Sequence, residues 1–262
     1  MVENNHNKNH DTGKYDEYII EVIDLFKSFQ NKIVLKNINL KIRRGRITVI
    51  MGRSGCGKTV LVKNIVGILS PERGKILFDG EDITNLSQSE RIKRIRNFGF
   101  LFQNSALFDW LTVEENIAFP LYEVKGIKDI KIIRERIDEI LEIVGLKGHE
   151  KKYPSELSGG MQKRTALARA IIHDPKVVIL DEPTSGIDPA TTSTIEDLIL
   201  DIKRRIKSTF IVITHDIKSA TRLADDIIFM KDGEIIFKGQ PEDLKKSKHP
   251  EIEIFLKRLE LS

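Results

Sequence analysis

The sequence predicts an α/β protein built on a mostly parallel sheet, and three observations support this. Short apolar runs without a polar face occur at residues 47–51, 177–180 and 210–214, as expected of strands buried on both sides. Each run ends at polar or charged residues, which is typical of the sheet edge where ligands bind. A stretch with helical spacing lies between the first two runs. With 262 residues, 40% of them hydrophobic, the chain can bury a sizeable core.

The N-terminal part is expected to contain a polar tail followed by antiparallel strands. Residues 1–17 are rich in Asn, His and Lys, which predicts a disordered tail, and His6 and His10 are read as ordinary members of it. Between residues 18 and 42, short alternations of apolar and polar residues indicate antiparallel strands with one exposed face. The alternating apolar residues include Ile20, Val22, Ile38, Leu40 and Ile42.

The first buried run leads into a phosphate-binding loop that matches G-x-x-x-x-G-K-[ST]. Its glycines allow backbone N–H groups to surround phosphates, and a helix that starts near Lys58 adds its positive dipole end. Lys58 is expected to reach the β- and γ-phosphates, and the Thr59 hydroxyl is expected to ligate Mg²⁺. The loop therefore predicts a nucleotide site that uses Mg²⁺. Its residues are Gly52, Arg53, Ser54, Gly55, Cys56, Gly57, Lys58 and Thr59.

The second buried run ends in two acids, Asp181 and Glu182. At the carboxyl end of a central strand they are expected to face the same crevice as the phosphate loop. We expect Asp181 to hold Mg²⁺ through water. Glu182 is expected to orient and polarise the water that attacks the γ-phosphate, because phosphoryl transfer depends on positioning and charge stabilisation.

The remaining elements follow from residue spacing. Residues 104–172 lack strand runs, and an apolar helical stripe within them ends at Gly145. Strands are expected again at 227–230 and 235–237, with a hairpin turn at 231–234. The stripe contains Ile133, Ile137, Ile140, Leu141 and Val144, and a second helical stripe near the C-terminus contains Ile252, Phe255, Leu256 and Leu259.

Six residues, Leu157-Ser158-Gly159-Gly160-Met161-Gln162, indicate which phosphate-loop proteins this chain resembles. Phe102-Gln103 precede them, and Ser185-Gly186-Ile187-Asp188 and His215 follow them, in the order of the motifs of ABC transporter ATPase subunits. The chain resembles that family over residues 18–244. The resemblance implies a P-loop NTPase core of RecA-like type, a small antiparallel β-subdomain, and a helical subdomain at about residues 104–172.

The resemblance also implies a site shared between two chains. In such ATPases the signature of one subunit completes the phosphate site of the other, so a head-to-tail homodimer sandwiches two ATP molecules. Close backbone approach at the signature glycines and the N-terminus of a helix at residues 161–172 suit this role. His215 would contact the γ-phosphate and organise the attack, and Gln103 would ligate Mg²⁺ and sense the membrane partner. The signature residues are Ser158, Gly159, Gly160 and Gln162, and Asp188 belongs to the D-loop.

Three residues of the site have more than one reading or depart from the family pattern. Phe29 stands where the family places an aromatic that stacks on adenine, and the alternative is a core phenylalanine at a strand end. Val60 stands where many relatives carry Ser or Thr, so one hydroxyl contact to the α-phosphate is expected to be absent. Cys56, the only cysteine, occupies a position that any small residue fits. The alternative is a thiol of lowered pKa whose alkylation blocks ATPase activity and is prevented by ATP.

The segment after Gln103 narrows the resemblance. Residues 101–109, 111–116 and 118–121 resemble the ATPases of the Mla/MCE phospholipid-trafficking systems. This implies a separate integral-membrane permease, an MCE-type lipid-binding subunit, and a phospholipid or another hydrophobic cargo. Residues 245–262 resemble the helical extension of that subfamily, which reaches across to the partner ATPase. The alternative is a helix that packs on its own domain.

Composition predicts a protein that stays in the cytoplasm, and the resemblance implies a subunit that is peripheral on the cytoplasmic face of the inner (cell) membrane. We find no apolar run of spanning length and no apolar signal core, and the net charge of +4 forms no basic stripe that would predict a nucleic-acid partner. Three alternatives stay open. One is an ATPase that serves an importer of polar solutes such as amino acids. Another is a soluble ABC ATPase acting on DNA or ribosomes, although the coiled-coil insertion or tandem halves of that class are not seen. The third is a non-catalytic module, which the intact Lys58, Asp181, Glu182 and His215 argue against.

Overall fold

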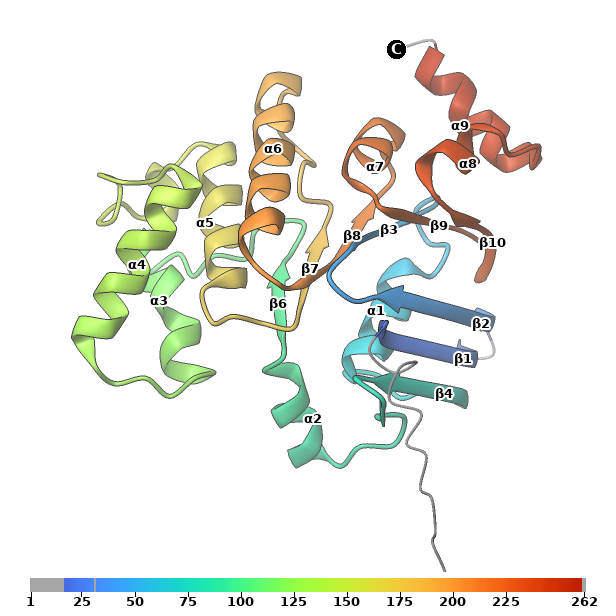
Figure 1. Ribbon diagram of the computed structural model, residues 1–262, viewed down its shortest axis with the longest axis horizontal. Helices are drawn as coiled ribbons and strands as arrows, with labels where there is room; N and C mark the ends of the chain where they lie inside the picture. Colours follow the sequence, from blue (N-terminus) through green and yellow to red (C-terminus); the bar gives the residue numbers. More distant parts are fainter. Residues whose placement is uncertain (1–16, 31, 261–262) are drawn as a thin grey trace, which may run out of the picture.

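The computed structural model describes residues 17–30 and 32–260, apart from the side chains of 258–260. This part of the chain contains two sheets, the helices around them and a helical subdomain at one end (Figure 1). The predicted tail lies outside the described residues except for Glu17, and so does the side chain of Leu259. No helix within the described ranges is long and apolar enough to cross a membrane.

A six-stranded sheet forms the centre of the fold, in the strand order β10-β9-β3-β8-β7-β6. Neighbouring strands are parallel except for the β9–β10 pair, so the predicted parallel sheet and the hairpin at residues 231–234 are both confirmed. Because the parallel strands end at one edge, the residues that follow β3, β7 and β8 come together there. The strands are β3 (Ile47–Met51), β6 (Phe98–Leu101), β7 (Val177–Asp181), β8 (Thr209–Thr214), β9 (Asp226–Lys231) and β10 (Glu234–Gly239).

The second sheet is antiparallel and has the order β2-β1-β4-β5. β1 (Tyr18–Phe29) and β2 (Lys32–Arg43) are the strands expected from the alternation at residues 18–42. The other two strands, β4 (Arg73–Phe78) and β5 (Glu81–Asp82), extend the sheet beyond that expectation. The predicted β-subdomain is therefore present, with two more strands than the sequence indicated.

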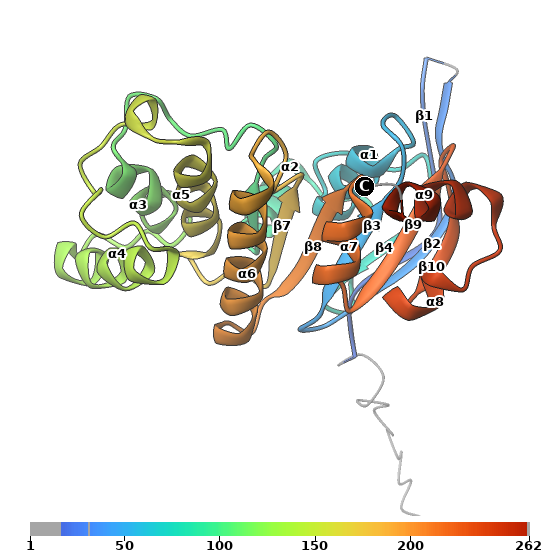
Figure 2. The same cartoon turned by 90° about the horizontal axis from the view of Figure 1, so that it is seen from above.

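Helices cover both faces of the central sheet. α6 (Pro189–Arg205) and α7 (Ile217–Leu223) lie on one face, and α1 (Lys58–Val66) lies on the other (Figure 2). Alternate residues of β3 serve two cores, because Val49 belongs to the cluster shared with α6 whereas Ile50 belongs to the cluster shared with α1. Burial on both sides explains why the central strands are apolar without alternation. A short polar helix, α2 (Gln88–Ile95), follows β5.

The helical subdomain lies beside β6 (Figure 1) and contains α3 (Val113–Glu123), α4 (Ile130–Val144), a 3-10 turn η1 (Pro154–Glu156) and α5 (Gly159–Ile171). The predicted stripe of α4 is buried, and Gly145 ends the helix in a left-handed conformation with φ of 64°. α5 approaches β6 very closely, since a Cβ on Gly99 would lie 1.8 Å from the carbonyl oxygen of Ala170. This contact fixes the C-terminal end of α5 to the sheet.

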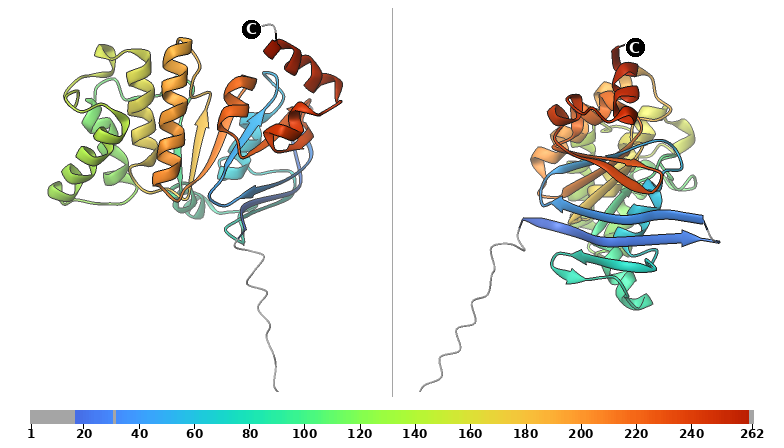
Figure 3. Two further views of the ribbon diagram at one scale, coloured as in Figure 1. Left: turned by 45° about the horizontal axis from the view of Figure 1, so that its top comes forward. Right: turned by 90° about the vertical axis from the view of Figure 1, so that its right-hand side faces the viewer.

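Two C-terminal helices, α8 (Pro241–Lys245) and α9 (Pro250–Glu260), lie at the β9–β10 end of the central sheet (Figure 3). Ile252 and Phe255 of α9 are buried, and the ring of Phe255 meets that of Phe229 edge-on, with centroids 4.9 Å apart. Of the two readings of this extension, the described residues show the helix that packs on its own domain. The apolar side of α9 is covered by the neighbouring strand β9, which contains Phe229.

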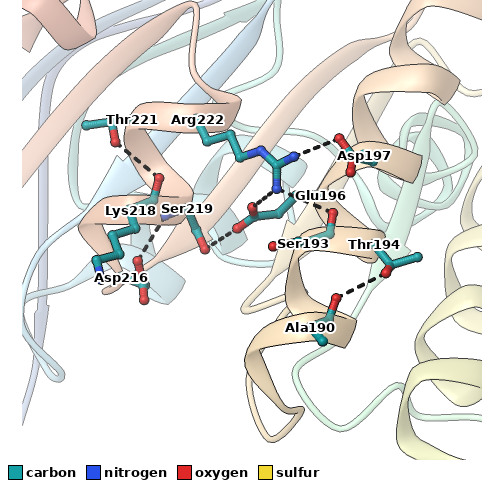
Figure 4. A network of polar contacts seen from close by, with 10 residues as sticks. All are labelled: Ala190, Ser193, Thr194, Glu196, Asp197, Asp216, Lys218, Ser219, Thr221 and Arg222. Atoms are coloured by element: carbon teal, nitrogen blue, oxygen red, sulfur yellow. Dashed lines mark hydrogen bonds and ion pairs between the residues drawn. The ribbon is translucent and has the colours of Figure 1, made fainter. Parts of the chain in front are cut away.

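A polar network centred on the buried carboxylate of Glu196 joins α6 to α7 (Figure 4). The carboxylate of Glu196 accepts hydrogen bonds from the Ser219 hydroxyl and from Arg222 Nη1, the latter at 2.8 Å. Arg222 Nη2 also bonds Asp197 Oδ1 at 2.7 Å. Since α6 begins just after Asp188 and α7 just after His215, the network ties together the two helices that follow predicted site residues.

Candidate active site

A cavity of about 530 Å³ lies at the edge where β3, β7 and β8 end. It brings together residues that are far apart in the sequence, as expected of the carboxyl edge of a parallel sheet. Some predicted site residues do not line this cavity: Phe29, Gly52, Cys56, Asp188 and the residues of the signature. The predicted residues in the wall are Arg53, Ser54, Gly55, Gly57, Lys58, Thr59, Val60, Gln103, Asp181, Glu182 and His215.

The phosphate loop has the backbone geometry that its sequence predicts. Gly57 precedes α1 with φ of 106°, and a Cβ there would lie 2.8 Å from the carbonyl oxygen of Val34, so only glycine fits. No side chain caps α1, which leaves its first N–H groups directed to the cavity, where an anion can accept them. Lys58 Nζ donates to the carbonyl oxygens of Gly52 at 2.8 Å and Arg53 at 3.0 Å, so its ammonium lies over the loop.

The two acids after β7 have different surroundings. Burial raises the pKa of Asp181, the neighbouring charge of Glu182 adds to this, and Lys58 and Lys163 oppose it. Glu182 lies in the left-handed region with φ of 49°, an unfavourable backbone conformation for a residue with a side chain. Its Oε1 is 2.7 Å from Nδ1 of His215, so the expected catalytic carboxylate and the histidine expected to contact the γ-phosphate are in direct contact.

The cavity wall offers oxygen donors suited to Mg²⁺. Thr59, Gln103 and Asp181 all line it, as predicted. Within the described part of the chain, no three His, Cys, Asp or Glu side chains gather into a metal cluster. An ion here would therefore share its coordination with nucleotide phosphates and water, which is the usual way that proteins hold Mg²⁺. The residues present fit Mg²⁺ bound with a nucleotide.

The signature residues form the start of α5, apart from the cavity. The Ser158 hydroxyl caps α5 by accepting from Met161 N at 3.3 Å, and Gln162 Nε2 donates to the carbonyl oxygen of Pro154 at 3.0 Å. A Cβ on Gly160 would lie 2.7 Å from Thr191 Cγ2, so the missing side chain makes room for the start of α6. Asp188 caps α6 by accepting from Thr191 N at 3.0 Å. Within one chain these residues have structural partners and do not line the cavity of the phosphate loop.

Two sequence readings change at residues outside the wall. The alternative reading of Cys56 as a thiol of lowered pKa is wrong, because the side chain is buried and burial raises its pKa, with Lys58 opposing. Phe29 is 41% exposed at the end of β1, and Lys27 Nζ lies 5.2 Å from its ring centroid. It is therefore not the buried core phenylalanine of the alternative reading, and its adenine contact stays a prediction.

Sequence reasoning missed three residues near the cavity. Phe255 of α9 lines it, and Glu251 of the same helix pairs with Arg53 of the phosphate loop at 3.2 Å. The helical stripe of residues 252–259 predicted α9 but did not indicate that this helix lies beside the cavity. The third is Lys163 of α5, which is 5% exposed and donates to the carbonyl oxygens of Gln103 and Glu182. Burial lowers the pKa of Lys163, and the charges of Glu182 and Asp181 oppose this.

The sequence pattern of the family described as ABC transporter matches residues 35–185. The chain belongs to this family. As a member with an intact phosphate loop and acid pair, it is an ATP-binding subunit with ATPase activity. Among relatives, it is 41% identical over 237 residues to the probable ribonucleotide transport ATP-binding protein mkl of Mycobacterium leprae, covering 90% of this chain and 68% of the relative. The chain thus spans about two thirds of that mycobacterial protein.

Two further relatives differ in their named cargo. The chain is 40% identical over 242 residues to the intermembrane phospholipid transport system ATP-binding protein MlaF of Haemophilus influenzae, covering 92% of this chain and 91% of the relative. It is 44% identical over 204 residues to the aliphatic sulfonates import ATP-binding protein SsuB of Bacillus anthracis, covering 77% and 76%. All three relatives are named as ATP-binding proteins of transport systems, whereas their named cargo differs.

Two solved structures share this fold over most of the chain. cbiO1 from Clostridium perfringens, part of the ABC transporter complex cbiONQ, superposes with a TM-score of 0.82 at 33% identity, covering 93% of this chain and 97% of that one. The ATP-binding cassette MJ0796, in a dimeric post-hydrolysis state bound to ADP and Pi, superposes with a TM-score of 0.76 at 32% identity, covering 85% and 98%. The predicted P-loop NTPase fold of ABC type is confirmed.

Proposed function

We propose that this ABC ATPase energises the movement of phospholipid or another hydrophobic molecule through a separate integral-membrane permease, on the cytoplasmic face of the cell membrane. ATP is held by the phosphate loop of one copy and the signature of a second copy in a homodimer. The observation that carries the dimer is the position of the signature: Ser158, Gly159 and Gly160 lie outside the cavity of their own chain. A second chain supplies them to the nucleotide, as the dimeric state of the related cassette supports.

In the proposed hydrolytic step, Lys58 and the N-terminus of α1 hold the phosphates. Thr59, Gln103 and, through water, Asp181 would hold Mg²⁺, which would neutralise charge on the phosphates when bound. Glu182 orients and polarises the attacking water, and His215, 2.7 Å from the Glu182 carboxylate, holds that carboxylate and reaches the γ-phosphate. Dimer closure drives the permease because ATP binds the closed dimer better than the open one.

The lipid cargo is supported by the relative MlaF, which matches over nearly its whole length and is named for phospholipid transport. Resemblance of residues 101–121 to the Mla/MCE ATPases supports it too, because these residues follow Gln103, where such subunits contact the permease. An MCE-type lipid-binding subunit is then expected in the complex. The second candidate is an importer of polar solutes, which the identity to SsuB favours.

Glu182→Gln tests the hydrolytic site. We expect turnover to fall about a hundredfold or more, the usual contribution of a general base, while ATP binding survives and the dimer accumulates in size-exclusion chromatography. Glu139→Gln, an exposed acid on α4, is the matched control and is expected to hydrolyse ATP normally. Turnover near the normal rate in Glu182→Gln would show that the role given to Glu182 is wrong.

Isolation of the complex from its own membrane tests the cargo. We expect a permease and a lipid-binding subunit to purify with the chain, and mass spectrometry to find phospholipid bound to them. A complex whose ATPase is stimulated by a polar solute and that carries no lipid would favour the importer instead.

A further inference from the structure

Lys163 lies in α5, two residues after Met161, and its ammonium is buried and forms no ion pair with a carboxylate of the described residues. The residue is 5% exposed, which is unusual for lysine because a charged group loses its hydration on burial. Its Nζ instead donates to two backbone carbonyl oxygens, that of Gln103 and that of Glu182, the latter at 3.4 Å. One buried cation thus serves two loops that both border the cavity.

The Glu182 backbone needs support at this point. Its φ of 49° is in the left-handed region, where a residue with a side chain is held only by its surroundings. The N–H of Glu182 donates to the carbonyl oxygen of Ile213 at 2.9 Å, so β8 holds one side of the residue. On the other side, the carbonyl oxygen of Glu182 accepts from Lys163 Nζ at 3.4 Å and from Ser185 N at 3.2 Å. Lys163 is the side-chain donor of this set, beside two backbone contacts.

The bond to Gln103 gives the same lysine a second task. Gln103 lines the cavity, and its carbonyl oxygen accepts from Lys163 Nζ. Because Lys163 belongs to the helix that begins with the signature, it connects three parts of the site: the signature helix, the loop after β6 and the acid after β7. A methionine would fill similar space but donate to neither carbonyl.

We propose that Lys163 is a positioning residue for the hydrolytic step, holding Glu182 in its productive backbone conformation and linking it to the loop that contains Gln103. The inference rests on the proposed role of Glu182 and does not depend on the cargo. Lys163 acts through these two carbonyls and touches no reacting atom. Its loss is therefore expected to slow hydrolysis while leaving the binding of ATP intact.

Lys163→Met and Lys163→Arg in the full chain test this, with ATP and Mg²⁺ in single-turnover and steady-state assays. We expect Lys163→Met to lower kcat by about tenfold or more, the effect of losing a hydrogen bond to a charged donor in the catalytic step, with KM and ATP affinity within about twofold of the wild type. Lys163→Arg keeps a cationic donor and is expected to recover most of the rate. The matched control is Arg136→Met, which removes a cation bonded at 3.0 Å to the carbonyl oxygen of Ile172, at the other end of α5.

Trp110, the only tryptophan, reports on the loop independently of turnover. It lies seven residues after Gln103 and is 73% exposed. We expect ATP with Mg²⁺ to change its emission in the wild type and in Arg136→Met, and to change it much less in Lys163→Met at saturating ATP. Equal emission changes in the wild type and Lys163→Met, or none in either, would refute the link to the Gln103 loop.

The outcomes separate the two levels of the argument. If Glu182→Gln abolishes turnover while Lys163→Met keeps the wild-type kcat, only the role of Lys163 is refuted. If Glu182→Gln hydrolyses ATP normally, the proposed site itself is wrong. Three outcomes would make the lysine a structural residue and overturn the proposal. Lys163→Met could fail to fold, it could lose ATP affinity as much as kcat, or Lys163→Arg could be as slow as Lys163→Met.

Discussion

Removing Arg222 should leave the buried carboxylate of Glu196 without its cation and weaken the junction between α6 and α7. Glu196 is 4% exposed and accepts from Arg222 Nη1 at 2.8 Å. Loss of one partner of a fully buried ion pair costs about 3–5 kcal/mol. The Arg222 side chain is 38% exposed, so water reaches one side of this pair and the cost falls to about 2 kcal/mol. The Ser219 hydroxyl remains as a partner and keeps the loss from being larger.

The perturbation is Arg222→Met, and the assay is urea unfolding followed by circular dichroism. We expect a loss of about 2 kcal/mol in the free energy of unfolding, equivalent to a fall of about 4–8 °C in Tm for a chain of this size. Glu196→Met combined with Arg222→Met should cost less than Arg222→Met alone, because no uncompensated buried charge remains. The matched control is Arg205→Met, which breaks an exposed pair with Asp201 on the same α6 and should cost less than about 0.5 kcal/mol.

The double variant decides the reasoning. If its loss equals the sum of the losses in the two single variants, Glu196 and Arg222 do not interact in solution. A loss in Arg205→Met as large as that in Arg222→Met would also refute the argument, because burial would then make no difference.

Two further predictions concern stability. Gly99→Ala should cost about 3 kcal/mol or more in urea unfolding, because the new Cβ would lie 1.8 Å from the backbone oxygen of Ala170 and α5 must move away from β6; wild-type stability would show that this close approach is absent. Asp79→Asn should cost about 1 kcal/mol at neutral pH, since Lys176 and Arg44 hold the pKa of Asp79 below its usual 3.8. A lowered pKa stabilises the fold above that value, so the difference from the wild type should vanish as pH falls below 3.8, and a constant difference down to about pH 2 would contradict this.

The sequence predicted those parts of the fold whose environment leaves a local pattern. The two-sided burial of β3, β7 and β8 appears as unbroken apolar runs, and the one-sided burial of α4 appears as a stripe at helical spacing. Among the elements that were not predicted, β5 has only two residues and α2 has no buried face. The capping box of Ser87 and Glu90 was the signal that could have identified α2.

The candidate site divides in the same way. Residues that bind phosphate through a fixed motif were predicted, since the spacing itself is the chemistry. Lys163 could not be predicted as a residue of the site, because a lysine in a helix is usually solvated and its contacts are with two distant segments. The position of α9 was equally beyond local pattern, because a stripe predicts a helix but not the surface that covers it.

The contacts of α9 bear on how shortened versions of this protein should be interpreted. Phe255 forms part of the cavity wall, and Glu251 holds both Arg53 and Lys231. A chain cut before residue 250 would therefore have an altered nucleotide cavity and a released phosphate-loop arginine. Weaker ATP binding by such a chain would therefore be explained by this local change, without the loss of a contact with another subunit. Point changes on the exposed face of α9, such as Glu253→Ala, keep the wall intact and separate the two effects.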